Sequence, residues 1–510
     1  WWTQCAIAEK LGRLDECLLA LDALERRFPE HPPVFSRRAD ILSRQGRLTE
    51  AIAWRRRALE LRPNDVALTQ SLLDEMVKAG DFSDFDALMA RLKHLLGDRR
   101  YGYYRNLFFH LNCHPTATPA QIWEYFRDWH DRSVKPSLRA PRPLTDIDRR
   151  PDRRLRIGYV SPDFRRHSMA YFMEPIFRGQ RDPAFREQCE VICYAHLDPG
   201  QADAYTDLFK SLSDGWRDIS RMGDAELERR IRDDRIDILI DMAGHTANNR
   251  LPLFLRRPAP VLAGWIYGYV QTTGLPELDW MVCDAQEVPP EHEACMAERH
   301  MARFSFAGHP YAPPPDAPEP RPLPCRERGY VTFGVTTQPR RLNEECVRAW
   351  ADILRQAPTA RLRFQRREYL EEAIQRLVLE RFAPCGIGPD RLEFRHITPY
   401  WDAYSDFDCH LDCFPVGYVT TLYEGLWMER PCVSLKARPP MGRVGWGTLR
   451  TLGLGERFAA DTLEDYVAKG AALANNPALL VESAAGLRDR MRRSPLMDYP
   501  AFGREIAALY

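Results

Sequence analysis

Three glycines at equal spacing dominate the start of the chain. Gly12, Gly46 and Gly80 follow one another at intervals of 34 residues, and Pro29 and Pro63 keep the same interval. The segments LGRLDECLLALDALERRFPEH and QGRLTEAIAWRRRALELRPND align around these positions. A period of this length, with Gly in the turn between two helices and Pro after the second helix, is typical of tetratricopeptide repeats. The pattern therefore predicts stacked helix pairs rather than an unrelated helical bundle.

Each helix pair of such a repeat leaves an apolar face that only a stacked neighbour can bury. Residues 1–98 are therefore predicted to form a curved solenoid with a concave binding surface. Residues 99–153 are predicted to be a helical connector and a linker rich in Pro, Arg and Asp, with a helix beginning at Thr118 and Pro119. An aromatic-rich stretch of the connector is interpreted as docking the solenoid onto the C-terminal part of the chain, not as a cofactor site: Tyr101, Tyr103, Tyr104, Phe108 and Phe109.

From Leu155 onwards, short apolar runs alternate with amphipathic segments. LRIGYVSPDF, CEVICYA, IDILIDMAG and APVLAGWIY are expected strands of a first unit, and YVTFGV, RLRFQ, RLEFRHI, FDCHLDCF and PCVSL of a second. Such alternation predicts parallel, doubly wound sheets, whose ligands lie beyond the carboxyl ends of the strands. The predicted architecture is an α-solenoid followed by two Rossmann-like domains, residues 154–325 and 326–510. A Pro-rich segment joins these domains, a cleft lies between them, and a C-terminal helix closes the second.

The stretch DCFPVGYVTTLYEGLW, residues 412–427, combines a strand end, a Pro/Gly turn, two hydroxyls and a helix start. The first N–H groups of a helix have no intrahelical partner, and the helix dipole adds partial positive charge there. Thr420 and Thr421 therefore indicate an anion site, and Glu424, one turn further on, could accept hydrogen bonds from a sugar diol. From this stretch alone, an ordinary capped helix in an α/β domain is the alternative.

The composition argues against two kinds of partner. Lys plus Arg and Asp plus Glu both total 72, so the formal charge is zero, which disfavours bulk binding to nucleic acid or anionic membranes. We find no apolar run long enough to span a bilayer and no signal peptide.

The 13 cysteines are expected to be reduced, mostly buried thiols of a cytoplasmic protein. No cysteine and histidine cluster offers the four convergent ligands of a closed zinc site, so no metal is predicted. The chain opens at Trp1 rather than Met, as expected of a fragment.

Four further segments occur in a recognisable order after the repeats: SPDFRRHSMAYF, DMAGHTANNRLPLFLRRPAP, TTGLPELDW and FPVGYVTTLYEGLW. In these motifs, and over nearly its whole length, the chain resembles the O-linked N-acetylglucosaminyltransferase and SPINDLY-like family. The resemblance implies a two-domain GT-B fold, a nucleotide-sugar donor, no metal or other cofactor, and inverting glycosylation of Ser or Thr. The implied reaction is transfer of N-acetylglucosamine from UDP-GlcNAc to an acceptor protein or peptide that the solenoid groove presents.

The resemblance also assigns roles by position. His167 matches a histidine at the mouth of the family's active site, and His245 matches a position that is often histidine in bacterial relatives. A histidine near neutral pKa can accept or relay the proton of the acceptor hydroxyl. The implied donor-binding residues are Gln338 and Arg341 at the nucleotide, Thr398, Pro399 and Tyr400 around the base, Thr420 and Thr421 at the pyrophosphate, Glu424 at the ribose, and also Val419.

Several positions depart from the family pattern. Arg341 replaces the usual Lys, Val419 stands where animal members have His, and Thr336-Thr337 replaces a common Phe-Asn pair. WIYGYVQTTG carries one residue more than usual, and the segment after Tyr400 is shortened. Two alternatives therefore stay open: protein O-fucosyl transfer from GDP-fucose, and a catalytically silent scaffold that binds peptides. Retention of the donor residues together with His167 favours an enzyme over the scaffold.

Overall fold

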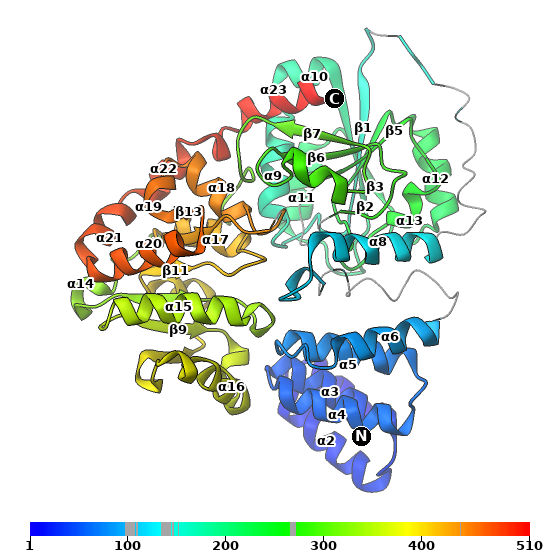
Figure 1. Cartoon of the computed structure of the whole chain (residues 1–510). Coiled ribbons are helices and arrows are strands. Elements are labelled where there is room, and N and C mark those ends of the chain that lie inside the picture. Colours follow the sequence, from blue (N-terminus) through cyan, green and yellow to red (C-terminus); the bar gives the residue numbers. More distant parts are fainter. Residues whose placement is uncertain are drawn as a thin grey trace.

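The computed structural model of the chain describes residues 1–96, 108, 111–133, 144, 147–150, 152–265, 272–438 and 440–510. Within them, helical repeats are followed by two α/β domains (Figure 1). The predicted fold class, an α-solenoid followed by two Rossmann-like domains, is confirmed. Residues 266–271 of WIYGYVQTTG and part of the 99–153 connector lie outside the described residues.

The solenoid consists of antiparallel helix pairs. Its helices are α1 (Trp2–Lys10), α2 (Leu14–Arg27), α3 (Pro32–Gln45), α4 (Leu48–Leu61), α5 (Val66–Lys78) and α6 (Phe85–Leu96). Gly12, Gly46 and Gly80 take φ values of 73°, 83° and 75°, and glycine is the residue that adopts this left-handed conformation at least cost. The repeat glycines therefore end one helix and turn the chain into the next, as the spacing predicts.

One expectation about the cysteines is wrong. Cys5 and Cys17, which were expected to be reduced, form a disulfide that joins α1 to α2. The physical reason is the antiparallel packing of these helices, which places the two buried side chains opposite each other, with their Cα atoms 4.3 Å apart. The other cysteines that the structure describes are free thiols, and most of them are buried.

In its first part, the connector is described at Phe108, residues 111–118 and helix α8 (Pro119–Ser133). The helix begins where the sequence predicts: the Thr118 hydroxyl accepts the Gln121 N–H at 3.2 Å, and the Gln121 side chain accepts the Thr118 N–H at 2.9 Å. This reciprocal arrangement is a capping box. Of the aromatic-rich stretch, Tyr101, Tyr103, Tyr104 and Phe109 lie outside the described residues.

The first α/β domain contains a parallel sheet of seven strands in the order β3-β2-β1-β4-β5-β6-β7. The strands are β1 (Leu155–Ser161), β2 (Cys189–Ala195), β3 (Gly215–Asp218), β4 (Ile238–Asp241), β5 (Val261–Trp265), β6 (Trp280–Asp284) and β7 (His300–Phe304). The helices are α9 (Ala170–Gly179), α10 (Pro183–Gln188), α11 (Ala204–Leu212), α12 (Asp224–Asp233) and α13 (Leu251–Phe254). The central strands are apolar on both faces, because helices cover both sides of a parallel sheet.

The second α/β domain has a six-stranded parallel sheet in the order β10-β9-β8-β11-β12-β13. The strands are β8 (Thr332–Val335), β9 (Arg361–Gln365), β10 (Leu392–Arg395), β11 (Cys409–Leu411), β12 (Cys432–Leu435) and β13 (Ala459–Ala460). The helices are α14 (Cys325–Arg328), α15 (Glu344–Gln356), α16 (Glu372–Phe382), α17 (Thr420–Trp427), α18 (Val444–Thr451), α19 (Gly455–Phe458), α20 (Leu463–Asn475), α21 (Pro477–Ala484), α22 (Leu487–Arg492) and α23 (Tyr499–Leu509). In both sheets the chain first adds strands on one side of its first strand and then adds the remaining strands on the other side. This change of side creates a crevice at the carboxyl edge.

The final helix crosses back to the first α/β domain. α23 lies beside α9 and α10 (Figure 1), and a Cβ on Gly503 would collide with the Gly179 carbonyl oxygen. Two glycines therefore allow the helices to touch backbone to backbone. The Tyr510 hydroxyl also hydrogen-bonds that of Tyr159 on β1 at 2.5 Å. None of the described helices is both long enough and apolar enough to cross a bilayer.

Candidate active site

The turn before α17 is built around one buried carboxylate. Asp412 directly follows β11, and its Oδ1 accepts the N–H groups of Cys413 at 2.9 Å and Tyr418 at 2.7 Å. Its Oδ2 accepts the Ser434 hydroxyl at 2.6 Å. Burial raises the pKa of Asp412 to about 6. These bonds close the segment between β11 and α17 into a fixed turn.

α17 starts at Thr420, where the sequence predicts a helix start. Its N-cap residue is the buried Val419, which has no polar side chain with which to accept the first helical N–H groups. Thr420 and Thr421 occupy the first turn and are half-buried. The unpartnered N–H groups of a helix start, the positive end of the dipole and two hydroxyls thus meet at one place. This arrangement is suited to binding an anion such as a diphosphate.

Arg341 contacts the same turn. It ends a short 3-10 helix, η3 (Pro339–Arg341), which follows β8. Its Nη1 donates to the Gly417 carbonyl oxygen at 2.9 Å, and its side chain is only 9% exposed. Gln338 is the N-cap residue of η3, and its buried Oε1 accepts no hydrogen bond from any described residue. Arg341 therefore both fixes the turn and places a permanent positive charge beside the N-terminus of α17.

Glu424 projects from α17 into a pair of tyrosines. Its Oε2 accepts the Tyr404 hydroxyl at 2.7 Å and also that of Tyr400, and the two hydroxyls are 3.1 Å apart. The carboxyl is 4% exposed, and burial raises its pKa to about 7. The ring of Tyr400 is 56% exposed although its hydroxyl reaches inwards, so this side chain forms a wall of the site. Sequence analysis did not find Tyr404, because only the folding of its 3-10 helix against α17 makes it a partner of Glu424.

A cavity of about 220 Å³ opens at the carboxyl edge of β8, β9 and β10. Tyr400, Tyr404 and Thr421 line it together with Thr336, after β8, and Gln365, the last residue of β9. The cavity thus lies where the strand order reverses between β8 and β11, the position at which doubly wound sheets bind ligands. It brings Thr421, in the first turn of α17, and the tyrosine pair to one space.

Three other residues lie at or beside this cavity. Thr398 and Pro399 are exposed, are joined by a cis peptide bond, and lead directly into Tyr400. Gln365 was missed by sequence analysis, although its place at the end of the expected strand RLRFQ was a usable signal. Both polar atoms of its amide are buried and make no hydrogen bond to a described residue. These residues belong to the side of the site farthest along the sheet from β11.

His167 lies in the other α/β domain, on the loop between β1 and α9. Its Nδ1 is 3.4 Å from Oδ1 of Asp163 and accepts the Met169 N–H at 3.3 Å. The side chain is 34% exposed. Burial lowers the pKa of His167 below its ordinary value and outweighs the attraction of Asp163, which acts in the opposite direction. The imidazole is therefore neutral at physiological pH and able to accept a proton.

His245 has different surroundings. It follows β4, and its ring packs against Phe108, Phe126 and Trp129, with centroid distances of 4.5, 5.4 and 5.0 Å. Its Nε2 lies 2.7 Å from the carbonyl oxygen of Thr273. The ring is buried. These contacts fit a residue that docks α8 and the connector onto the first sheet better than one that receives a substrate proton.

The two α/β domains meet close to the loop of His167 and to the N-terminal part of α17. Phe172 of α9, five residues after His167, packs edge-on against Tyr423 of α17, with centroids 5.3 Å apart. The Tyr423 hydroxyl also accepts the His309 N–H at 2.6 Å. Glu424, the next residue, has an electrostatic influence on Tyr171. The loop of His167 and the N-terminal part of α17 therefore face each other across the domain junction.

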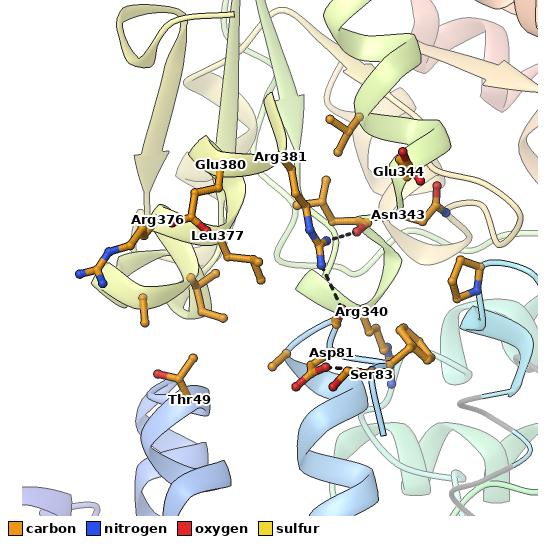
Figure 2. Close-up of a pocket in the computed structure, with 18 of the residues that line it drawn as sticks. Thr49, Asp81, Ser83, Arg340, Asn343, Glu344, Arg376, Leu377, Glu380 and Arg381 are labelled. Carbon is orange, nitrogen blue, oxygen red and sulfur yellow. Dashed lines mark hydrogen bonds between the residues drawn. The ribbon is translucent and has the colours of Figure 1, made fainter. Parts of the chain in front are cut away.

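A larger groove, about 1310 Å³, lies between the solenoid and the second α/β domain. Figure 2 shows Thr49, Asp81 and Ser83 on the solenoid side and residues of η3, α15 and α16 on the other. The groove carries both charge signs, with arginines and carboxylates in similar number. An extended polypeptide offers backbone groups and mixed side chains that such a lining can bind.

Two contacts fix the solenoid beside this groove. Glu371, the residue before α16, accepts the N–H groups of Leu48 at 2.5 Å and Thr49 at 3.0 Å, as well as the Thr49 hydroxyl. It thereby caps the N-terminus of α4 from another domain. Arg381 donates to the Gly80 carbonyl oxygen at 3.2 Å and to that of Leu342, as the dashed lines in Figure 2 show. The repeat turns thus contact Glu371 and Arg381, and Arg381 links the Gly80 turn to Leu342, the residue after Arg341.

The site offers an anion-binding region on one side of the junction between the two α/β domains and a basic side chain on the other side. The donor side offers Arg341, the start of α17 and the carboxyl of Glu424. The acceptor side offers His167. Among the described residues there is no group of three or more side chains suited to holding a metal ion. The arrangement can stabilise a departing diphosphate and accept a proton from an incoming hydroxyl.

Comparison with known proteins gives a consistent result. Residues 138–310 match the model of a family described as "Glycosyl transferase family 41". The solved structure of a mutant of the Thermobaculum terrenum O-GlcNAc transferase is 30% identical in sequence and superposes with a TM-score of 0.87. The comparison covers 100% of this chain and 95% of that one.

Two plant proteins also match this chain, each over less than half of its own length. A "Probable UDP-N-acetylglucosamine--peptide N-acetylglucosaminyltransferase SPINDLY" of Solanum lycopersicum is 32% identical over 414 residues, covering 80% of this chain and 43% of that protein. The protein of Arabidopsis thaliana with the same description but named SEC is 28% identical over 368 residues, covering 70% of this chain and 37% of that protein. The chain therefore spans less than half the length of these curated relatives.

Proposed function

The chain belongs to glycosyl transferase family 41, together with the O-GlcNAc transferases, and we propose that it transfers N-acetylglucosamine from UDP-GlcNAc to Ser or Thr of proteins. The observation that carries the proposal is the convergence of Arg341, the start of α17 and the Glu424–tyrosine cluster on one crevice. A nucleoside diphosphate presents two kinds of group, phosphate and ribose hydroxyl, and this crevice offers a partner for each.

In the proposed reaction, the diphosphate departs at the N-terminus of α17. The Thr420 and Thr421 hydroxyls, the helix N–H groups and the Arg341 charge stabilise the developing negative charge, so that the chain itself supplies what a metal would otherwise supply. Arg341 cannot deprotonate at working pH, and its bond to Gly417 fixes its position before the donor arrives. Glu424, between Tyr400 and Tyr404, accepts hydrogen bonds from the ribose.

On the acceptor side, His167 takes the hydroxyl proton as the Ser or Thr oxygen attacks the sugar carbon. Attack from the face opposite the diphosphate inverts the configuration at that carbon. The neutral state of the half-buried imidazole supports this role, because a proton acceptor must be uncharged at working pH. We leave His245 out of the proposed catalytic set, because aromatic rings surround it.

The acceptor is proposed to be a polypeptide that the solenoid presents through the groove of Figure 2. This groove borders η3 and therefore leads from the concave repeats towards the donor residues. We propose that the protein works in the cytoplasm, without a bound cofactor and without nucleic acid or membrane partners.

The proposal is tested by incubating the full chain with UDP-GlcNAc or GDP-fucose, a Ser/Thr-containing peptide library and a chelator. The expected result is one N-acetylhexosamine on Ser or Thr, located by mass spectrometry, with release of UDP and no effect of the chelator. His167→Ala should lower turnover by about a hundred-fold or more while leaving donor affinity within a few-fold. Fucose transfer from GDP-fucose would replace the proposed donor. Donor binding without any transfer would support the silent scaffold.

A further inference from the structure

Two buried carboxyl groups lie at the carboxyl edge of the first sheet, beside the loop that carries His167. Asp241 is the last residue of β4, and Asp163 follows the end of β1 at Ser161 by two residues. β1 and β4 are parallel neighbours with Val160 opposite Asp241, so both carboxyls leave the sheet at the same edge. Asp163 and Asp241 are 4% and 1% exposed.

Each carboxyl uses one oxygen and leaves the other without a partner. Asp241 Oδ2 accepts the Gly244 N–H at 2.6 Å, and Asp163 Oδ1 lies 3.4 Å from Nδ1 of His167. Asp241 Oδ1 and Asp163 Oδ2 are buried and accept no hydrogen bond from any described residue. An unpartnered buried carboxylate oxygen is costly. A proton on either carboxyl lowers this cost, because it removes one of the two buried negative charges.

The electrostatics of the pair favour a single charge. Burial raises the pKa of Asp163, and it raises the pKa of Asp241 to about 7, with the negative charge of Asp163 adding to the rise. Two neighbouring carboxyls in a poorly solvated site resist ionising together. Ionisation of one carboxyl therefore opposes ionisation of the other, and the two titrations are linked.

Few other charges face Asp163. From its own loop these are His167 and Arg165, whose Nη2 is 3.9 Å from Asp163 Oδ1. Arg166 points elsewhere and pairs with Asp316 at 2.6 Å, while its backbone N–H donates to the Asp203 carboxylate on the neighbouring segment. From β4 the facing group is Asp241. Burial, His167 and Arg165 therefore act on the ionisation of Asp163, and the charge of Asp163 acts in turn on Asp241.

Nδ1 of His167 has two competing partners. It is 3.4 Å from the Asp163 carboxylate, which accepts a proton, and 3.3 Å from the Met169 N–H, which donates one. A neutral imidazole carries its proton on one nitrogen only. With Asp163 ionised, the proton is held on Nδ1 and Nε2 keeps a free lone pair. With Asp163 protonated, Nδ1 accepts from Met169 and the proton moves to Nε2.

We propose that Asp163 is a positioning residue that sets the tautomer of His167, and that the neighbouring Asp241 carboxyl shifts the pH at which this setting changes. The inference rests on the proposed function of His167. In the proposed reaction the acceptor hydroxyl gives its proton to Nε2, so the tautomer with a free Nε2 is the active one. That transfer gives an imidazolium whose Nδ1–H faces the Asp163 carboxylate, and the proton then leaves to solvent. Below the pH at which Asp163 ionises, the base is switched off.

The first test reads the tautomer directly in the full chain. Nitrogen chemical shifts of 15N-histidine-labelled protein, assigned to His167 with the His167→Gln variant, distinguish Nδ1–H from Nε2–H. We expect Nε2–H at low pH and Nδ1–H at high pH in the parent, and Nε2–H throughout in Asp163→Asn. Nε2–H at every pH in the parent would overturn the proposal. Because this readout needs no turnover, it stands whether or not the chain transfers N-acetylglucosamine.

The second test uses pH–rate profiles with UDP-GlcNAc and a peptide. Asp163→Asn should lower kcat by ten-fold or more, with donor affinity by calorimetry within two-fold of the parent. Asp241→Asn should keep the kcat plateau but move its acidic limb about one pH unit lower, because a neutral amide no longer opposes ionisation of Asp163. Asp207→Asn, an exposed change on α11, is the matched control. Identical acidic limbs in the parent and Asp241→Asn would overturn the proposal.

Discussion

Gly80→Ala is expected to loosen the solenoid from the donor-side domain, whereas Gly12→Ala is not. The two glycines occupy the same position of the repeat and have φ values of 75° and 73°. A Cβ on Gly80 would lie 2.5 Å from the carbonyl oxygen of Pro339, while a Cβ on Gly12 would meet nothing within 4 Å. Because Pro339 begins η3, the clash acts directly on the segment that carries Arg341.

The magnitude follows from two separate costs. Placing alanine in the left-handed region costs about 1–2 kcal/mol, and both variants bear this cost equally. Forcing extra atoms against a packed backbone adds about 1–3 kcal/mol, and this term applies to Gly80→Ala alone. The difference between the variants is therefore roughly 1–3 kcal/mol, equivalent to about a five- to 150-fold change in the equilibrium between docked and undocked states.

Hydrogen–deuterium exchange followed by mass spectrometry measures this difference. Peptides that cover residues 336–343 should exchange faster in Gly80→Ala than in the parent, and at the parental rate in Gly12→Ala. Both variants should exchange faster within their own repeat turn. Equal exchange of residues 336–343 in the two variants would refute the claim that the Gly80 turn supports η3.

Three further outcomes are expected from the same contacts. Glu371→Ala should remove the cap of α4, cost about 0.5–2 kcal/mol, and raise exchange at Leu48 and Thr49, while the exposed Glu372→Ala should not; equal exchange in both would contradict the cap. His245→Ala should lower stability by about 2–4 kcal/mol, with donor affinity unchanged in calorimetry, and a loss of turnover without a loss of stability would restore a catalytic role. The stability of Glu424→Gln minus that of the parent should increase by up to about 3 kcal/mol from pH 5 to pH 8. The reason is that the raised pKa of Glu424, about 7, makes its ionisation destabilise the folded parent as pH rises. Equal melting-temperature differences between the two proteins at both pH values would argue against this ionisation.

Much of the fold could be predicted because its signals are local. The 34-residue interval of Gly12, Gly46 and Gly80 is written in consecutive sequence, and each glycine has the left-handed conformation that the turn requires. The start of α17 at Thr420 was equally visible, since a Pro/Gly turn and two hydroxyls mark it. Local signals of this kind do not depend on which distant segment packs nearby.

Several of the missed features depend on pairings between distant segments. Glu371 caps a helix more than 300 residues earlier in the chain, and no sequence pattern around Glu371 predicts that contact. Tyr404 becomes a partner of Glu424 only after η7 (Tyr400–Ser405) folds over α17. His245 carries an attractive local motif, AGHT, yet its surroundings are set by Phe108 and α8 from the connector. The local motif was therefore a weaker guide than the packing of aromatic rings from elsewhere.

The assigned roles of the donor residues remain predictions until a nucleotide is bound. Arg341 is 9% exposed and bonded to Gly417, so it supports the turn even without a ligand. Glu424 is likewise bonded to Tyr404, and ribose would have to share that carboxylate. These contacts give the donor site a preformed shape, and variants at these positions therefore affect both the turn and the ligand.

Calorimetric titration of UDP into the parent, Arg341→Lys and Arg341→Ala tests the central claim, that a nucleoside diphosphate binds between Arg341 and the start of α17. Loss of a charge-assisted contact costs about 1.5–3 kcal/mol, which corresponds to roughly a ten- to 150-fold loss of affinity. We expect a loss of this size in Arg341→Ala and a smaller one in Arg341→Lys, which keeps the charge. Equal UDP affinity in all three proteins, or no UDP binding by the parent, would contradict the account.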